Sequence, residues 1–181
     1  MPWKNGGGST TEIAIGPVGA SLDAFDWRIS MAQVASDGPF SMFDSIDRTL
    51  AVIEGSGMEL TIGGEAPVVL GHASEPLSFP GDVPTTARLL AGDITDLNVM
   101  TRRGQFSHRV VRVTQPMSCK FDGDDIVIVL SVGSTTEVGT PDEQATLEHA
   151  DAVLVVASET ALFQINATGG CYLIWLRASA E

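Results

Sequence analysis

The chain has 181 residues, 44% of them hydrophobic, which is enough for one domain with a substantial core or for two small fused halves. Ten Lys and Arg stand against 23 Asp and Glu, and the net charge of −13 argues against nucleic acid and anionic membranes as partners. The two cysteines form no C-x-x-C pair, and the first residues lack the apolar run of a secretory leader. We therefore expect a reduced, cytoplasmic protein with buried free thiols.

The first polar feature along the chain is the segment Pro2-Trp3-Lys4-Asn5-Gly6-Gly7-Gly8-Ser9-Thr10-Thr11-Glu12. Its three consecutive glycines allow positive φ and a close approach of the backbone to a neighbouring group. Lys4, Asn5 and Glu12 place a cation, an amide and a carboxylate around them. Gly- and Ser-rich termini are also typical of disordered tails. Taken alone, the segment is compatible with a binding element or with a tail.

Short apolar runs with period two follow this segment, separated by Gly, Pro, Asp and Ser, and helical periodicity is scarce. In residues 25–32 the odd positions are apolar and most even positions are polar. Trp27 and Arg28 are therefore predicted to face opposite sides of a sheet. Such a pattern is the signature of an all-β sandwich or barrel.

A hairpin is predicted from residues 46–54 and 58–62, because Gly55 and Gly57 supply the turn conformations between them. Residues 80–84, with a proline at each end, are predicted to form a tight bend, since proline cannot continue a central ladder.

The remaining strand candidates extend to the end of the chain, and short segments of the two halves resemble one another, which indicates a weak internal duplication with a seam at 104–108. These candidates are residues 68–70, 77–79, 97–101, 110–113, 126–132, 152–156, 162–165 and 171–177.

No metal or nucleophile motif is readable in the sequence. His72, His108 and His149 stand apart, without the H-x-H or H-x-x-x-H spacing that places two imidazoles on one side of an element. There is no Gly-x-Ser-x-Gly elbow, and the glycine run is not followed by the Lys-Ser/Thr pair of a phosphate loop. We expect neither a bound metal nor a cofactor.

The cations, in contrast, lie in unusual places. Several of the ten, including Arg28, Arg48 and Arg102, occur inside or at the ends of predicted core strands. In residues 96–102 the alternation places Asp96, Asn98, Met100 and Arg102 on one face. A barrel with Arg28 and Asn98 in its lumen would hold a small carboxylate, because guanidinium binds it through two parallel hydrogen bonds. Structural ion pairs with nearby Asp and Glu are the alternative.

The sequence resembles the HutD/Ves family across its first 104 residues. The combination of motifs is specific although no single motif is, and the second half agrees in its strand pattern. The motifs are Pro2-Trp3-Lys4-Asn5-Gly6-Gly7-Gly8, Glu12-Ile13-Ala14, Phe25-Asp26-Trp27-Arg28-Ile29-Ser30, Asp37-Gly38-Pro39-Phe40-Ser41, Ile46-Asp47-Arg48 and Asp96-Leu97-Asn98-Val99-Met100-Thr101-Arg102-Arg103-Gly104.

The resemblance implies a cupin-like bicupin of two fused β-barrel halves, here 1–104 and 105–181, and an association with bacterial histidine utilisation. It also implies a non-catalytic protein that binds a small metabolite. Two departures stand out. Family members usually carry a further strand before the Pro-Trp-Lys motif, so either the start codon was chosen late or that strand is missing, which would leave an unpaired sheet edge. The turn before Asp47-Arg48 also differs.

We therefore expect a metal-free protein that binds a small anionic metabolite such as formylglutamate, formiminoglutamate or urocanate, acting as a sensor or governor. The alternatives are a metal-independent isomerase, lyase or hydrolase, with Glu12 or Asp82 as general base and Lys4 as acid, and an interaction scaffold without ligand. A homodimer is the default assembly. The predicted ligand-binding residues are Trp3, Lys4, Asn5, Gly6, Gly7, Glu12, Arg28, Asn98, Met100 and Arg102.

Overall fold

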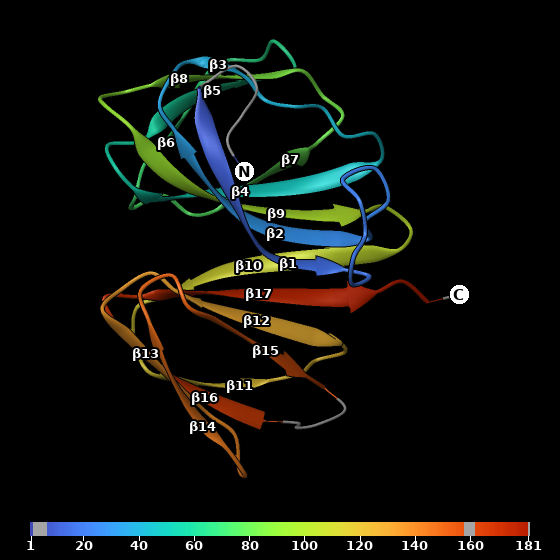
Figure 1. Ribbon diagram of the computed structural model, residues 1–181, viewed down its shortest axis with the longest axis vertical. Coiled ribbons are helices and arrows are strands. Elements are labelled where there is room, and N and C mark those ends of the chain that lie inside the picture. Colours follow the sequence, from blue (N-terminus) through green and yellow to red (C-terminus); the bar gives the residue numbers. More distant parts are fainter. Residues whose placement is uncertain (2–6, 158–161, 181) are drawn as a thin grey trace. The chain divides into compact units, whose positions relative to one another are not determined.

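The computed structural model describes residues 1, 7–157 and 162–180, which form seventeen β-strands and no helix (Figure 1). The prediction of an all-β fold is confirmed. Since the described residues contain no helix, none of them belongs to a helix that could cross a membrane. The chain divides into two compact units, Met1–Phe106 (unit 1) and Ser107–Glu181 (unit 2).

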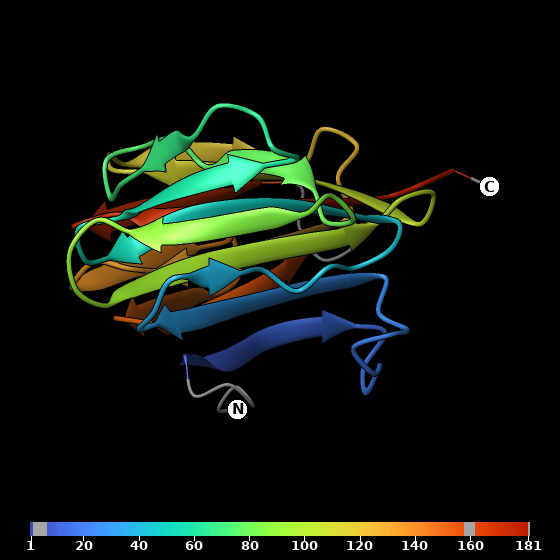
Figure 2. The same ribbon diagram turned by 90° about the horizontal axis from the view of Figure 1, so that it is seen from above.

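Unit 1 is built around a five-stranded antiparallel sheet with the strand order β1-β2-β9-β4-β7. Strand β1 pairs with β2 at one edge of this sheet, as Figure 2 shows. The long central strands carry alternating side chains to the inside of the unit. The bounds are β1 (Gly8–Gly16), β2 (Trp27–Val34), β9 (Ile94–Arg102), β4 (Ile46–Glu54) and β7 (Leu77–Pro80).

A second, four-stranded sheet completes unit 1 in the order β3-β8-β5-β6. Its strands are β3 (Gly38–Pro39), β8 (Thr85–Leu89), β5 (Met58–Ile62) and β6 (Val68–Leu70). The predicted turn between β4 and β5 is confirmed, with φ of 88° at Gly55 and 99° at Gly57. A Cβ atom at Gly57 would lie 2.5 Å from the carbonyl oxygen of Leu70, so this turn requires glycine.

Two groups of buried apolar side chains pack within unit 1. The larger group combines residues of both sheets, so the sheets pack face to face. The smaller group lies at the other end of the central strands. The larger group is Ala32, Val34, Leu50, Val52, Met58, Leu60, Leu70, Phe79, Ala87 and Ile94, and the smaller one is Phe25, Ile46 and Met100, with Ile15, Ala20 and Phe43 packed against them.

Unit 2 also consists of two four-stranded sheets, ordered β10-β17-β12-β15 and β11-β16-β13-β14. The strands of the first are β10 (Phe106–Val113), β17 (Cys171–Ala178), β12 (Ile126–Ser131) and β15 (Ala152–Val156). Those of the second are β11 (Met117–Lys120), β16 (Leu162–Thr168), β13 (Thr135–Gly139) and β14 (Gln144–Glu148).

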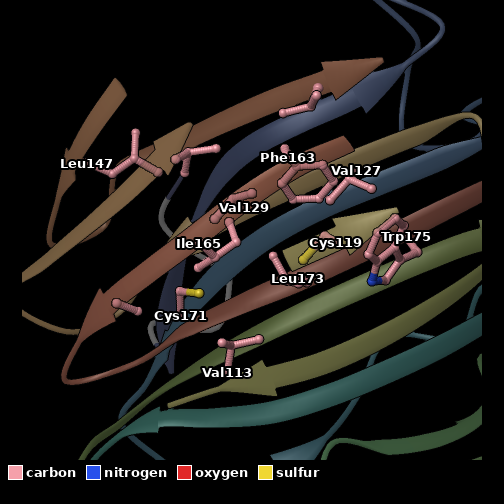
Figure 3. Packing of buried hydrophobic residues seen from close by; sticks show 13 residues of the cluster. Val113, Cys119, Val127, Val129, Leu147, Phe163, Ile165, Cys171, Leu173 and Trp175 are labelled. Atoms are coloured by element: carbon pink, nitrogen blue, oxygen red, sulfur yellow. The ribbon is translucent and has the colours of Figure 1, made fainter. Parts of the chain in front are cut away.

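The interior of unit 2 is filled by apolar side chains (Figure 3). Phe163 and Trp175 meet with ring centroids 5.8 Å apart, and Phe121 packs on both rings. Cys119 and Cys171 are buried free thiols, as predicted. Burial raises the pKa of Cys119 to about 11 and that of Cys171 to about 12, so both thiols are unreactive at neutral pH.

Candidate functional site

A layer of buried polar side chains crosses the interior of unit 1. Antiparallel pairing places Met100 of β9 opposite both Arg28 of β2 and Arg48 of β4. One step along β9 on the same face, Asn98 lies opposite Ser30 and Leu50. Directly opposed residues point to the same face, so these side chains converge inside the unit.

Apolar residues bound this layer on both sides. Asp96, the next inward position of β9, pairs with Ala32 and Val52 of the larger apolar group, whereas Met100 belongs to the smaller one. The polar residues between the two groups are held away from water, with exposed fractions of 1–5%. We call them the polar layer: Arg28, Ser30, Arg48, Asp96 and Asn98.

Arg28 is anchored by neighbours on its own sheet. Its Nε donates to Oε2 of Glu12 at 2.9 Å, and its Nη1 donates to Oγ of Ser30 at 3.4 Å. Glu12 reaches Arg28 from β1, where a register shift follows it, and its side chain is 43% exposed. The guanidinium of Arg28 therefore has one partly solvated carboxylate as its counter-ion.

Arg48 is buried among aromatic rings. Its Cζ lies 5.2 Å from the ring centroid of Phe40, 5.6 Å from that of Phe43 and 5.9 Å from that of Phe79. Nη2 contacts Sδ of Met100 at 3.7 Å, and Nε is buried without a hydrogen-bond partner among the described residues. Burial lowers the pKa of Arg48 to about 10, because desolvation and the charge of Arg28 outweigh the attraction of Asp96.

Asp96 is the buried carboxyl group of the layer. Its Oδ1 accepts a hydrogen bond from Nδ2 of Asn98, while Oδ2 is buried and meets no donor in the part of the chain that the structure describes. Burial raises the pKa of Asp96 to about 7, against the opposing effects of Arg48 and Asn98. Near neutral pH, Asp96 is therefore balanced between a neutral acid and a carboxylate.

This arrangement can bind an anion. Two guanidinium groups face one partly exposed carboxylate and one carboxyl group that is easily neutralised. A small carboxylate could accept a hydrogen bond from Nε of Arg48, which would satisfy a buried donor. Asp96 could donate a proton to an oxygen of the same molecule, or accept a hydrogen bond from an N–H group of it.

The structure brings four of the predicted site residues to this region: Glu12, Arg28, Asn98 and Met100. Gly7 continues the pairing of β1 with β2, since its carbonyl accepts a hydrogen bond from the amide of Ala35 at 2.9 Å. Trp3, Lys4, Asn5 and Gly6 lie outside the described residues.

Arg102 has partners of another kind. Its Nε donates to the carbonyl of Phe25 at 2.9 Å, and Nη2 donates to that of Asp23 at 3.2 Å. Its guanidinium also lies 5.8 Å from the ring centroid of Phe25. Arg102 thus holds the loop that precedes β2.

Three residues of the layer, Ser30, Arg48 and Asp96, are absent from the predicted set of ligand-binding residues, and two of them, Arg48 and Asp96, are charged. The signal for both is present in the sequence. Arg48 alternates with Leu50 and Val52 along β4, and Asp96 shares a face of β9 with Asn98. A charged residue in phase with the inward apolar positions of a central strand indicates a buried functional group.

No group of three or more His, Cys, Asp or Glu side chains that could hold a metal ion occurs within residues 1, 7–157 and 162–180.

The sequence matches the HutD family model over residues 1–173. It is 39% identical over 100 residues to an uncharacterised 21.2 kDa protein in the hutC 3′ region of Pseudomonas putida, and 38% identical over 109 residues to the protein Ves of Citrobacter koseri. These alignments include 55% and 60% of this chain, and span only 52% and 56% of the length of those relatives.

Solved structures extend the likeness to the whole fold. The structure of HutD from Pseudomonas fluorescens SBW25 superposes with a TM-score of 0.85 at 36% identity, covering 99% of this chain and 94% of that one. A cupin 2 conserved barrel domain protein from Leptotrichia buccalis has a TM-score of 0.60 at 8% identity, covering 95% and 89%. The predicted cupin-like fold is thereby confirmed, and the chain belongs to the HutD family.

Proposed function

We propose that unit 1 binds a small carboxylate metabolite in the polar layer. One observation carries the proposal: Nε of Arg48 and Oδ2 of Asp96 are both buried, and neither has a hydrogen-bond partner among the described residues. A buried polar atom without a partner typically costs about 1–3 kcal/mol. A ligand that supplies an acceptor to Arg48 and a polar group to Asp96 removes both costs when it binds.

Charge favours an anion as this ligand. Arg28 and Arg48 are 5% and 4% exposed, and the positive charge of each disfavours the binding of a cation beside it. Asp96 can take up a proton as an anion arrives, because its pKa is about 7. The net charge of −13 repels an anion from the protein as a whole, whereas the two buried cations attract an anion locally.

The family relationship supports a metabolite of histidine utilisation as the ligand. The HutD name and the position of the P. putida relative beside hutC support an association with histidine utilisation. Formylglutamate, formiminoglutamate and urocanate each carry a carboxylate and an N–H group, the two features that the layer can satisfy. The P. fluorescens HutD structure is described as a formate condition, which makes formate a useful minimal probe. In this proposal the protein acts as a metal-free sensor or governor, and Trp3, Lys4 and Asn5 contribute to the site.

Thermal shift and isothermal titration calorimetry test the proposal with the three metabolites, glutamate and formate. Arg48→Met and Arg28→Ala are the site variants, and Arg88→Ala is the matched control, because Arg88 forms an exposed ion pair with Glu59 in the same unit. We expect at least one metabolite to stabilise the wild type and the control, and neither site variant. Equal stabilisation of all four proteins, or of none, would refute the proposal.

One observation favours an enzyme as the second candidate. A carboxyl group with a pKa near 7 beside a guanidinium is suited to general acid–base chemistry, and Asp96 is such a group. Asp82 is not, because Arg103 holds its pKa at about 2. Turnover of a metabolite by the wild type that is lost in Asp96→Asn, with metabolite binding retained, would place this candidate first.

A further inference from the structure

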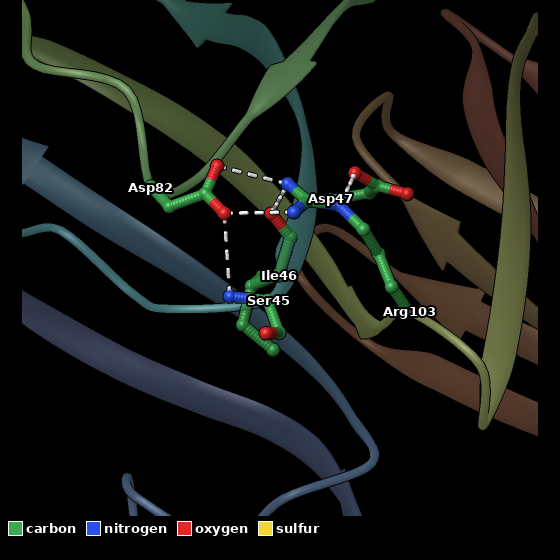
Figure 4. A network of polar contacts seen from close by, with 5 residues as sticks. All are labelled: Ser45, Ile46, Asp47, Asp82 and Arg103. Carbon is green, nitrogen blue, oxygen red and sulfur yellow. Dashed lines mark hydrogen bonds and ion pairs between the residues drawn. The ribbon is translucent and has the colours of Figure 1, made fainter.

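Arg103 forms a dense polar network just after the end of β9 (Figure 4). Its Nη1 and Nη2 donate to the two carboxylate oxygens of Asp82 at 2.7 and 2.9 Å, and its Nε donates to Oδ1 of Asp47 at 2.7 Å. Nη2 also donates to the carbonyl of Ile46 at 3.0 Å. One guanidinium thus joins the start of β4 to the turn between β7 and β8.

The same network holds the segment that leads to Arg48. The amide of Phe43 donates to the carbonyl of Gly81 at 2.9 Å, next to Asp82. The amide of Ser45 lies 3.4 Å from Oδ2 of Asp82, and the carbonyl of Ser45 accepts a hydrogen bond from the amide of Arg103 at 2.9 Å. Residues 40–45, which we call the Phe43 segment, are therefore tied at this end to Arg103.

At its other end the Phe43 segment is fixed to the second sheet, where the amide of Phe40 donates to the carbonyl of Thr85 at 2.9 Å. Between the two attachments, the rings of Phe40 and Phe43 lie against the guanidinium of Arg48. Phe43 also packs edge-on against Phe25, with centroids 6.0 Å apart. The segment forms an aromatic wall of the polar layer.

We infer that Arg103 is a positioning residue for the Arg48 site: acting through Asp82 and the Phe43 segment, it keeps the aromatic wall closed and so governs ligand release. The inference rests on the proposed function, because it concerns the release of the proposed ligand. Its physical basis is that a guanidinium with hydrogen bonds to two carboxylates and a carbonyl holds its neighbours in one geometry.

Two features separate this network from an ordinary surface ion pair. The first is the number of bonds: Arg88 and Glu59 form a single exposed ion pair, and such a pair rarely holds its residues rigidly. The Phe43 segment also includes Ser45 with φ of 60°, a conformation that a non-glycine residue adopts only where its surroundings impose it. In this conformation the Ser45 amide donates to Oδ2 of Asp82, and the Ser45 carbonyl accepts a hydrogen bond from the main-chain amide of Arg103.

Stopped-flow measurement of formylglutamate dissociation tests the inference in the full chain. We expect dissociation roughly tenfold faster in Arg103→Ala, an intermediate rate in Arg103→Lys, and the wild-type rate in Arg88→Ala. If Arg103 acts through Phe43, the effects of Arg103→Ala and Phe43→Leu on the rate are not additive in the double variant. Additive effects, or equal rates in Arg103→Ala and Arg88→Ala, would overturn the inference.

A second readout needs no ligand. The Nε–H of Arg48 lacks a hydrogen-bond partner among the described residues, so its exchange with water, followed by NMR, reports how well the wall is closed. The signal is assigned by its loss in Arg48→Met. We expect exchange to be roughly tenfold faster in Arg103→Ala than in Arg88→Ala. Unchanged exchange refutes the role of Arg103, whereas faster exchange in a protein that binds no metabolite refutes only the proposed function.

Discussion

Replacing Arg48 by methionine removes a buried charge and keeps a long, unbranched side chain among the three phenylalanines. Burial lowers the pKa of Arg48 from its ordinary value of 12.5 to about 10. Each pKa unit corresponds to about 1.4 kcal/mol, so keeping this charge in the folded chain costs about 3 kcal/mol. The buried charge therefore destabilises the folded chain at every pH below about 10, and this cost disappears only as the pH rises from 10 to 12.5.

Methionine avoids this cost and can contact the same rings through its sulfur, while the cation–π attraction of up to about 2 kcal/mol is lost. We therefore expect Arg48→Met to raise the free energy of unfolding at pH 7 by about 1–3 kcal/mol and to abolish the stabilisation by metabolite. Asp96 then loses its attraction to Arg48, so its pKa rises above 7 and it stays neutral.

Urea unfolding at pH 7, with and without metabolite, measures both effects. A gain in midpoint at constant m-value isolates the change in stability. The reasoning would be refuted if Arg48→Met lowered the free energy of unfolding by 1 kcal/mol or more at constant m-value, roughly the value of one lost hydrogen bond, because the guanidinium would then be satisfied in the free protein. Retention of the metabolite-induced shift would refute its part in binding.

Three further predictions concern other buried groups. The pKa of Asp96 is about 7 in the folded chain against 3.8 ordinarily, so the protonated carboxyl group stabilises the folded chain fully below pH 3.8, and about 4 kcal/mol of this stabilisation is lost as the pH rises to about 7. Urea unfolding of Asp96→Asn between pH 4 and 8 should lack this pH dependence. A parallel dependence in wild type and variant would contradict the prediction. Cys119 and Cys171, whose pKa values are raised by burial, should react with a thiol reagent at pH 8 only after unfolding, and rapid labelling of the native protein would disprove their burial. Phe163→Ala in unit 2 should lower the free energy of unfolding by about 3–5 kcal/mol through loss of packing on Trp175, with metabolite affinity unchanged; altered affinity measured by calorimetry would count against a site confined to unit 1.

The two units place different chemistry in their interiors. In unit 1, the inward positions of β2, β9 and β4 include two arginines and an aspartate. Among the described residues of unit 2, the corresponding space holds a continuous apolar cluster. The buried Ser131 and Thr136 satisfy each other through a hydrogen bond of 2.9 Å between their hydroxyl groups. The apolar interior of unit 2 stabilises its fold, whereas the buried arginines and aspartate of unit 1 provide the polar groups on which the proposed binding depends.

Alternation along single strands is the property that the sequence alone settles. The ranges 46–54, 58–62, 68–70 and 152–156 coincide with β4, β5, β6 and β15, since each is rich in apolar residues and is bounded on at least one side by glycine, proline or an acidic residue. Six strands were not predicted. Several of them carry small or polar residues at inward positions, such as Thr85 and Ala87 of β8, and so lack a hydrophobic alternation: β1, β3, β8, β11, β13 and β14.

The polar layer itself is a product of tertiary structure. Alternation predicts that Asn98 and Met100 share a face, but it does not relate them to Arg28 and Arg48, which lie 50 to 72 positions earlier in the chain. Strand pairing sets Arg28 and Arg48 on either side of Met100, and in this register the Nε of Arg48 and the Oδ2 of Asp96 are buried without a hydrogen-bond partner among the described residues. The physical reason is that burial and neighbouring charge, which shift the pKa of Asp96 to about 7, arise from segments brought together by folding.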